Sequence, residues 1–550
     1  MSQAKKYLIT SALLYANGSV HFGHIAGCYL PADVFARFAR LRGDEVLFLC
    51  GSDEYGVAIT LSAEIAGRSP KEQVDHFDQI NRDLFSKIGI SFDHFSRTTW
   101  EGHVKTTQEF FLDLQKNGHI EEKVTEQLYS EKEKRFLADR YVLGICPKCG
   151  FEEARGDECP SCGGNFEATD LKSPKSKLTG APLVLKETKH WFLRFDHFRD
   201  ELKHFIAEKN WKPNVKNFAL SYIEDLRERS ITRDSDWGVP LPIENSDGKV
   251  FYVWFDAPIG YISAAREWAE KTGGSWKDFW CDEKTRFINF VGKDNIPFHA
   301  FFFPAMLMGQ DQPYKLVDDL PANEFLNLEG KQFSKSSGWY IDLEEFFQHF
   351  TADQIRYCLA ANSPETQDSE FTWDDFQMRC NAELVGKFGN FANRTLIFVH
   401  KRCEGKIPPQ NDLAEIDKTF LANVEKLFHE IAFSFEGYHL RKASQQIMEL
   451  AALGNVYFDA KKPWVTAKDP ATFPDTETTL HNCLICLRAL SVVSSPIIPD
   501  AAEKLAKMIG GSVNSWKMEL PTVGEALPEA EILFQKVEPE LISTFKEKLT

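Results

Sequence analysis

The stretch YLITSALLYANGSVHFGH, residues 7–24, opens the chain with an apolar run, a turn and a pair of histidines. The apolar run predicts a buried strand over residues 7–14, Asn17-Gly18 predicts a turn, and apolar spacing predicts a helix over residues 23–42. Further elements are predicted as a strand at Glu45–Cys50 and helices at residues 56–66, 70–88 and 104–117. This alternation is typical of an α/β protein with a doubly wound parallel sheet, which places His21 and His24 at the carboxyl edge, where ligands bind.

Between residues 118 and 237 the periodicity weakens, and we interpret this span as an insertion. Strands predicted at Val250–Phe255 and Phe287–Val291, followed by a helix over residues 297–308, resume the alternation. One nucleotide-binding fold is therefore expected in two separated halves. Beyond Phe371 the pattern predicts a helical bundle, with helices at residues 374–403, 413–435, 441–457, 478–493 and 500–509. The mixed, charged pattern of residues 520–550 predicts a C-terminal strap, meaning a segment that runs back along the protein, with a final short helix.

The composition is that of a multidomain protein with several packed cores, because 43% of the 550 residues are apolar and 13% are aromatic. A net charge of −17 argues against indiscriminate nucleic-acid binding, including DNA. One window is locally basic: Arg379, Lys387, Arg394, Lys401, Arg402 and Lys406. Its charge fits a phosphate track and a solvated helix face equally well. No apolar stretch reaches the ~18 residues of a membrane span, so no membrane partner is expected.

Four of the twelve cysteines are arranged as Cys146-x2-Cys149-x9-Cys159-x2-Cys162. Four thiolates on two tight turns suit a tetrahedral zinc without an open position, and such a closed site is structural. Paired disulfides are the alternative. The remaining cysteines are mostly isolated in apolar surroundings, which indicates a reducing, cytoplasmic location. The pattern therefore predicts one structural Zn²⁺ inside the insertion.

A second short motif, Gln332-Phe333-Ser334-Lys335-Ser336, lies about three hundred residues after the histidine pair. Lys335 falls in a Ser/Gly-rich loop, and such a loop can close over a triphosphate and deliver one ammonium group. His21 and His24 supply two imidazoles at the start of a helix, where backbone amides and the helix dipole favour phosphate. Gly23 between them allows a nucleotide to approach the backbone closely.

Together and in this order, the two motifs resemble the HIGH and KMSKS signatures of class I aminoacyl-tRNA synthetases. A third segment, Trp254-Phe255-Asp256-Ala257-Pro258-Ile259-Gly260-Tyr261, narrows the resemblance to the methionyl-tRNA synthetase family, and the match covers nearly the whole chain. The chain departs from the signature at Gln332, where the family usually has its first lysine. Lys331 stands one place earlier, and whether it supplies the missing charge is left open.

The resemblance implies the residues that bind each substrate. For ATP they are His21, Gly23, His24, Arg233, Gly292, Asp294 and Lys335, of which His21, His24 and Lys335 are the expected catalytic residues. For methionine they are Ala12, Leu13, Tyr15, Asp53, Trp254, Ala257, Pro258, Tyr261 and His299. This second set suits an unbranched thioether, because it is largely apolar and aromatic with a few polar groups. Asp53 is expected to hold the substrate ammonium.

In the helical bundle, the resemblance assigns Asn390, Arg394 and Trp464 to the anticodon. An exposed indole offers a stacking platform for an unpaired base, while Asn and Arg read base edges or phosphates. Without the resemblance, we would interpret Trp464 as a packing residue of the bundle. The expected domains are the first catalytic half (1–117), the connective insertion (118–237), the second catalytic half of the Rossmann-type fold (238–325), a KMSKS-loop region (326–373), the α-helical anticodon-binding domain (374–520) and a C-terminal strap (521–550).

The resemblance implies a methionine–tRNA ligase that forms methionyl-adenylate from methionine and ATP and then charges tRNA(Met), both elongator and initiator. Mg²⁺ is expected with ATP, and the protein is expected to be a cytoplasmic monomer. Two alternatives stay open. One is a valyl, isoleucyl or leucyl synthetase, although the roughly 120 residues of the insertion leave little room for the editing domain of those relatives. The other is a catalytically silent tRNA-binding paralogue.

Overall fold

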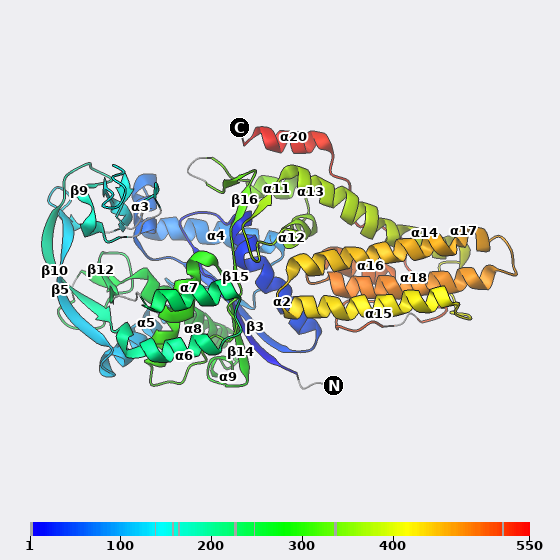
Figure 1. The fold of residues 1–550 in the computed structure, drawn as a ribbon, viewed down its shortest axis with the longest axis horizontal. Helices are drawn as coiled ribbons and strands as arrows, with labels where there is room; N and C mark the ends of the chain where they lie inside the picture. The colour runs from blue at the N-terminus through cyan, green and yellow to red at the C-terminus, as the bar shows by residue number, and fades with distance from the viewer. Residues whose placement is uncertain are drawn as a thin grey trace.

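The computed structural model describes residues 4–137, 139–156, 159–162, 166–224, 228–246, 248–334, 338–519 and 522–549. Figure 1 shows an α/β body that carries the N-terminal half of the chain and a bundle of long helices that extends from one side of it. No helix among the described residues is both long and apolar enough to cross a membrane.

A parallel sheet forms the centre of the α/β body. Its strands are β1 (Lys6–Ser11), β2 (Leu14–Tyr15), β3 (Glu45–Asp53), β4 (His94–Arg97), β14 (Thr285–Gly292) and β15 (Ala322–Asn323). The order is β15-β14-β1-β3-β2, with β4 also paired to β3. Lys6 is paired with Glu45 on one side and with Thr285 on the other. The two halves of the fold therefore meet at β1, and the predicted parallel α/β sheet is confirmed.

Helices cover both faces of this sheet. They are α1 (Phe22–His24), η1 (Ile25–Tyr29), α2 (Leu30–Leu41), α3 (Val57–Ala66), α4 (Pro70–Ile88), α5 (Glu101–Lys116), α8 (Val253–Thr272), α9 (Lys277–Trp280), η5 (Lys293–Asn295), η6 (Phe298–Phe302) and α10 (Phe303–Met308). The limits of α4 follow from local chemistry: Ser69 and Glu72 form a capping box, and Gly89 ends the helix at φ 75°. The helix predicted over residues 23–42 is α1, η1 and α2 in unbroken succession.

One predicted strand is wrong in its second half. Residues 250–255 were expected to be extended, but β13 spans Lys249–Phe251 and α8 begins at Val253. Tyr252 is the extended residue that precedes the helix. A short apolar run does not distinguish a strand from a buried helix, so the run continues across the boundary without a change of pattern. As a result Trp254 and Asp256 project from the first turn of a helix.

In the span 118–237, the residues that the structure describes form two small sheets, two α-helices and one strand of a third sheet. One sheet consists of β5 (Ile120–Ser130), β6 (Arg135–Phe136), β10 (Val184–Leu193) and β11 (Arg229–Ser230), and the other of β7 (Val142–Ile145), β8 (Ala154–Arg155) and β9 (Lys172–Ser176). Short helical turns are η2 (Asp139–Tyr141), η3 (Ala168–Asp170) and η4 (Phe195–Phe198), and the helices are α6 (Arg199–Glu208) and α7 (Pro213–Glu224). β12 (Thr232–Asp234) then pairs with β13. Leu202 and Val215 join the main core, so α6 and α7 pack on the α/β body.

A small sheet of β16 (Leu326–Leu328), β17 (Lys331–Gln332) and β18 (Ser369–Phe371) leads into the helical part. Its helices are α11 (Leu343–His349), α12 (Ala352–Ala361), α13 (Trp373–Met378), η7 (Arg379–Gly389), α14 (Asn390–Arg402), α15 (Glu415–Glu436), α16 (Leu440–Lys461), α17 (Pro463–Thr466), α18 (Phe473–Ser494), α19 (Pro499–Met508) and α20 (Pro539–Glu547). α13, η7 and α14 are continuous, because the junction residues Arg379 and Asn390 keep right-handed helical backbone angles. The expected helical bundle is confirmed.

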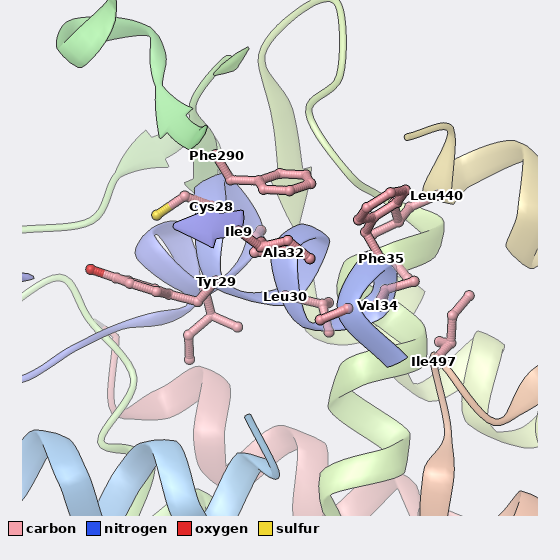
Figure 2. Close-up of a cluster of buried hydrophobic side chains, with 14 of the residues drawn as sticks. Ile9, Cys28, Tyr29, Leu30, Ala32, Val34, Phe35, Phe290, Leu440 and Ile497 are labelled. Atoms are coloured by element: carbon pink, nitrogen blue, oxygen red, sulfur yellow. The ribbon is translucent and has the colours of Figure 1, made fainter. Parts of the chain in front are cut away.

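The bundle is joined to the α/β body through a shared core. Figure 2 shows Ile9 of β1 and Phe290 of β14 beside Phe35 of α2, with Leu440 and Ile497 of the bundle reaching the same cluster. A buried ion pair reinforces this joint. Arg356 of α12 donates to Asp33 of α2 over 2.6 Å and to the carbonyl oxygen of Ile497 over 2.8 Å. Both side chains are fully buried, so the joint is a fixed part of the core.

Candidate functional site

A cavity of about 680 Å³ lies at the carboxyl edge of the central sheet. It is lined by every predicted nucleotide and methionine residue that the structure describes: Ala12, Leu13, Tyr15, His21, Gly23, His24, Asp53, Arg233, Trp254, Ala257, Pro258, Tyr261, Gly292, Asp294 and His299. Lys335 lies outside the described residues. Residues separated by almost three hundred positions therefore share one wall, because β1 and β14 are neighbours in the sheet.

The histidine pair stands at the start of the α1–η1–α2 helix. His21 is the extended residue before the helix, and its backbone N–H donates to Nδ1 of His24 over 3.3 Å. The two imidazole rings stack with their centroids 3.7 Å apart. A Cβ at position 23 would lie 3.0 Å from two ring atoms of His21 and 3.4 Å from Phe333. The absence of a side chain at Gly23 thus relieves a tight contact in this close arrangement.

The loop that precedes Lys335 also contacts the histidine pair. Gln332 and Phe333 both line the cavity. Lys331 points elsewhere, because its Nζ lies 4.1 Å from the centroid of the Trp339 ring. Ser334 and Trp339 exchange two backbone hydrogen bonds of 2.8 Å and so close the loop at its base. In this conformation Lys331 does not replace the charge that is absent at Gln332.

The nucleotide side of the cavity carries Gly292, the last residue of β14, and Asp294 of η5, which follows it. Between them, Lys293 is held outside by Asp368 at 2.8 Å and by Glu324 at 2.9 Å. Arg233 comes from β12, and its guanidinium stacks on the Tyr252 ring at 3.9 Å. The cavity therefore has a cation on one wall and an acidic side chain near the end of a parallel strand, where a ribose could be held.

On the apolar side, the Trp254 ring stacks on the Phe298 ring with centroids 3.5 Å apart. Tyr261 Oη lies 2.8 Å from Nε2 of His299, whose Nδ1 lies 2.8 Å from the carbonyl oxygen of Asn295. Burial lowers the pKa of His299 to about 4, so its imidazole is neutral near pH 7. The Asn295 oxygen can only accept, which puts the proton on Nδ1 and makes Nε2 the acceptor for the Tyr261 hydroxyl.

Asp53 lines the cavity, and its charged neighbour Asp256, which does not line it, was missed by the sequence interpretation. Asp53 ends β3, and Asp256 sits on the first turn of α8; both are more than nine-tenths buried. Burial, followed by the negative charge of Asp256, raises the pKa of Asp53 well above its usual range. Asp256 lies inside the segment Trp254–Tyr261, so it could have been predicted from the same motif. Arg140 of the insertion, also missed, lines the cavity too.

The four predicted zinc ligands come together. Their sulfur atoms lie within 4.8 Å of one another, with Cys146 and Cys162 at 3.9 Å and Cys149 and Cys159 at 3.6 Å. A tetrahedral zinc with bonds of about 2.3 Å separates its sulfurs by about 3.8 Å. The spacing therefore fits the ion that the sequence predicts, and all twelve cysteines are free thiols, so the disulfide alternative is not supported.

The three residues assigned to the anticodon gather at the far end of the bundle. Asn390 Nδ2 donates to Asn455 Oδ1 over 3.0 Å, and Arg394 donates to Asp459 Oδ1 over 2.5 Å. The indole of Trp464 packs on Phe458 with centroids 6.2 Å apart and is 38% exposed. An exposed aromatic face beside amide and guanidinium groups can stack and read an unpaired base. Asn455 and Asp459, which orient these groups, were not foreseen.

The basic window near this end is largely neutralised. Arg379 pairs with Asp375 at 2.8 Å and with Glu383 at 3.2 Å. Lys406 lies 3.5 Å from Glu404. Lys387 lies 3.8 Å from Glu383, so four of the six charges have an acidic neighbour.

Residues 7–396 match the family model described as tRNA synthetases class I (M). This chain belongs to the methionyl-tRNA synthetase family. Residues 407–550 match a second model, described as the anticodon binding domain of methionyl tRNA ligase. The resemblance expected from three motifs is confirmed, and membership of the methionyl-tRNA synthetase family excludes the valyl, isoleucyl or leucyl alternative.

Curated relatives extend this similarity over the whole chain. The methionine–tRNA ligase of Protochlamydia amoebophila is 58% identical over 547 residues, which cover 98% of this chain and 78% of that protein. The methionine–tRNA ligase of Chlamydia trachomatis serovar A is 49% identical, covering 99% of this chain and 100% of that protein. Among solved structures, Mycobacterium tuberculosis methionyl-tRNA synthetase in complex with methionyl-adenylate has a TM-score of 0.80 and 27% identity, covering 96% of this chain and 99% of that one.

Proposed function

We propose that this chain activates L-methionine with ATP to methionyl-adenylate and transfers methionine to the 3′ end of tRNA(Met). The observation that carries this function is the single cavity in which the predicted nucleotide residues and the predicted methionine residues face one another. The curated relatives support it, because those proteins are methionine–tRNA ligases.

In the first step a carboxylate oxygen of methionine attacks the α-phosphorus of ATP. The bond to the bridging oxygen breaks, and pyrophosphate leaves with the electron pair. His21 and His24, at the start of the helix, are placed to donate to the phosphate oxygens, and Arg233 also lines the cavity. Lys335 supplies a further positive charge in this proposal. ATP enters as its magnesium complex, and catalysis is mainly positional and electrostatic.

Methionine occupies the apolar side of the cavity. Trp254, Pro258 and Ala257 contact its side chain, and the Tyr261 hydroxyl, held by neutral His299, faces the thioether. Asp53 receives the ammonium group, with Ala12, Leu13 and Tyr15 forming the adjoining wall. Gly292 and Asp294 hold the ribose. A long unbranched side chain fits this aromatic slot, whereas the β-branched side chain of valine or isoleucine fills it poorly.

The sulfur atoms of Cys146, Cys149, Cys159 and Cys162 would hold one zinc ion. When bound, the ion ties the two turns of the insertion together and takes no part in the chemistry. Cys146 and Cys159 are buried while the other two are exposed, so the ion closes the small core around β7 and β8.

Asn390, Arg394 and Trp464 contact the anticodon of elongator and initiator tRNA(Met) in this proposal. The insertion contributes Arg140 to the cavity wall, and its Tyr141 donates to Thr60 of α3 over 2.9 Å. These contacts support a role for the insertion near the acceptor end of the tRNA. The domain limits at residues 117, 237, 325, 373 and 520 belong to the same proposal. We further propose a cytoplasmic monomer, in keeping with twelve free thiols.

Amino-acid-dependent exchange of pyrophosphate into ATP tests this function. Methionine should support exchange without tRNA, whereas valine, isoleucine and leucine should not. A catalytically silent tRNA-binding paralogue would give no exchange with any amino acid, and a different specificity would give exchange with another one. Either result would overturn the proposal. His24→Ala serves as the matched inactive control, because it removes one of the two phosphate donors and leaves the methionine side intact.

A further inference from the structure

A cluster of buried polar side chains joins α15 to the last turn of α16, which ends shortly before Trp464. Asp417 of α15 is fully buried, and its Oδ1 accepts from the Tyr457 hydroxyl over 2.6 Å and lies 3.2 Å from Nζ of Lys461. Its Oδ2 accepts from the backbone N–H of Ala414 over 2.9 Å. Both carboxylate oxygens therefore have donors, and the ammonium of Lys461 balances the buried charge.

The same cluster includes α18. Asn482 of α18 donates to the Tyr457 hydroxyl over 2.9 Å, and Lys461 also pairs with Asp475, in the first turn of α18, at 2.5 Å. The ring of Tyr457 stacks on that of Phe420 with centroids 3.9 Å apart. α15, α16 and α18 are therefore held together at the point where α16 ends.

The chain leaves its helical path directly after Lys461. Lys462 has left-handed backbone angles, φ 47° and ψ 57°, which residues other than glycine seldom adopt. Pro463 then begins α17, whose second residue is Trp464. Such a backbone conformation persists where the surrounding structure holds it in place. The ion pair of Lys461, one residue earlier, provides a fixed point from which this turn starts.

The other end of α17 is also fixed to α18. Thr466 Oγ1 lies 2.6 Å from Thr476 Oγ1, and the Thr472 hydroxyl donates to the carbonyl oxygen of Thr466 over 2.8 Å. Figure 1 shows this short helix at the end of the bundle that is far from the α/β body. Trp464 therefore sits on a short segment that is held on both sides, by the Asp417–Lys461 pair before it and by the threonine contacts after it.

The indole of Trp464 depends on this segment for its direction. The ring is 38% exposed, and its centroid lies 6.2 Å from that of Phe458. A loose contact on one side does not fix an exposed ring. A platform for a base binds well only if its orientation is set in advance, because ordering it on binding costs affinity. The backbone at Lys462 must therefore supply much of the orientation.

We infer that Asp417 is a positioning residue for recognition of tRNA(Met): through Lys461 it fixes the turn at Lys462, and thereby the direction of the Trp464 indole. Asp417 is fully buried and touches no RNA itself. The inference rests on the proposed function, in which Trp464 contacts the anticodon, and it adds a buried charge to the residues on which that contact depends.

The test combines Asp417→Asn with Trp464→Ala in the whole protein. Asp417→Asn preserves shape but removes the charge, so that Lys461 keeps only the more exposed Asp475 as a partner. We expect kcat/KM for aminoacylation to fall about three- to tenfold, mostly through KM for tRNA, because part of the base stacking is lost. Methionine-dependent pyrophosphate exchange should change by less than about twofold, since no tRNA takes part in it.

The double variant decides whether Asp417 acts through Trp464. If it does, Asp417→Asn should cause no further loss in a protein that already carries Trp464→Ala, because the two changes then remove the same interaction. The discrimination between tRNA(Met) and a transcript with one altered anticodon base should also shrink in Asp417→Asn. A residue that only stabilised the bundle would leave the discrimination by folded protein unchanged.

Glu430→Gln is the matched control. It makes the same kind of change on α15, in an exposed pair with Lys426 at 3.8 Å, and should leave both activities unchanged. Thermal midpoints of all variants check that they are folded. If Asp417→Asn does not fold, Lys461→Met repeats the test from the other partner, because it removes the ammonium and keeps an unbranched side chain.

An unchanged KM for tRNA in folded Asp417→Asn would overturn the inference. Losses that multiply in the double variant would do the same, as would a fall in exchange equal to the fall in aminoacylation. Aminoacylation at the parental rate by Trp464→Ala would reject the anticodon role of Trp464, and the inference with it. The activity itself is tested separately, because pyrophosphate exchange by the parent protein involves no tRNA.

Discussion

The rings of His21 and Phe333 lie parallel, with an interplanar angle of 6° and centroids 4.9 Å apart. His21 belongs to the first signature and Phe333 to the second, so the two motifs are in direct contact. The ring of Phe333 therefore packs on the histidine that is expected to donate to phosphate.

Replacing Phe333 by alanine should slow methionine-dependent pyrophosphate exchange about two- to tenfold, because an aromatic pair contributes roughly 0.5–1.5 kcal/mol. Phe333→Tyr keeps the ring and should exchange at nearly the parental rate. The decisive quantity is kcat for exchange at saturating ATP. Equal rates in Phe333→Ala and the parent would show that this ring contact does not position His21.

Lys335→Ala should slow exchange by a factor on the order of 10² to 10³, because a charge that stabilises the transition state is lost. Lys331→Ala is the matched control, since its ammonium lies over Trp339 and away from the cavity. We expect less than about a twofold effect there, within the range of an exposed cation–π contact. A large loss in Lys331→Ala would instead show that Lys331 turns towards ATP during the reaction.

Metal analysis of the purified protein should give about one zinc per chain, and Cys149→Ser should lose it, because three thiolates leave the site open to water. Cys281→Ser changes a partly buried cysteine outside the cluster and should keep the zinc. Retention of stoichiometric zinc by Cys149→Ser would contradict the assigned ligand set.

Trp464→Ala should lose ~1–3 kcal/mol of base stacking, which is about one to two decades in kcat/KM for aminoacylation of tRNA. Pyrophosphate exchange should hardly change, because no tRNA takes part in it. Trp373→Ala is the contrasting variant: Trp373 is fully buried, and its loss should cost ~3–5 kcal/mol of stability and depress both activities. If Trp464→Ala behaved like Trp373→Ala, Trp464 would be a packing residue.

His299 should make stability depend on pH. Its folded-state pKa of about 4 lies below the ordinary value of about 6.5, so the unfolded chain takes up the proton first as the pH falls. The stability that neutral His299 contributes is complete above about pH 6.5 and is lost towards pH 4. The asparagine in His299→Asn cannot titrate. Between about pH 6.5 and about pH 4, the free energy of unfolding of the parent should therefore fall by on the order of 3 kcal/mol relative to that of the variant. Urea unfolding of both proteins across this range measures the difference, and a constant difference would refute the neutral buried state.

Much of the fold could be predicted because its elements carry strong local signals. β1, β3 and β14 have apolar central residues, and the long helices have apolar spacing with clear caps such as Ser69. β5 and β10 were missed because apolar and polar residues do not alternate regularly along their sequences. Val124 is 64% exposed, and both faces of the strand pair are rich in charged residues. The limits of β13 were missed because an apolar run crosses from strand to helix at Tyr252.

In the candidate site, only the residues that belong to recognisable sequence motifs could be predicted. His21, Trp254 and the four cysteines stand in recognisable patterns, and the structure brings each set together. The direction of Lys331 depends on Trp339, which lies beyond the loop, and no pattern in the motif reports that contact. Arg140 reaches the cavity from the insertion, and Asp256 of α8 affects the charge of Asp53 at the end of β3. Such properties arise from tertiary packing and not from spacing along the chain.

The unbroken succession of α13, η7 and α14 has a consequence for how this chain can change over evolutionary time. Each residue of a helix turns the chain by about 100°, so deleting one residue within this rod would rotate everything beyond it by that angle. Asn390 and Arg394 would then face away from Asn455 and Asp459 on α16, although their identities were untouched. Side chains along the rod's solvent face can vary freely, but we expect its number of residues to be constrained more tightly than its composition.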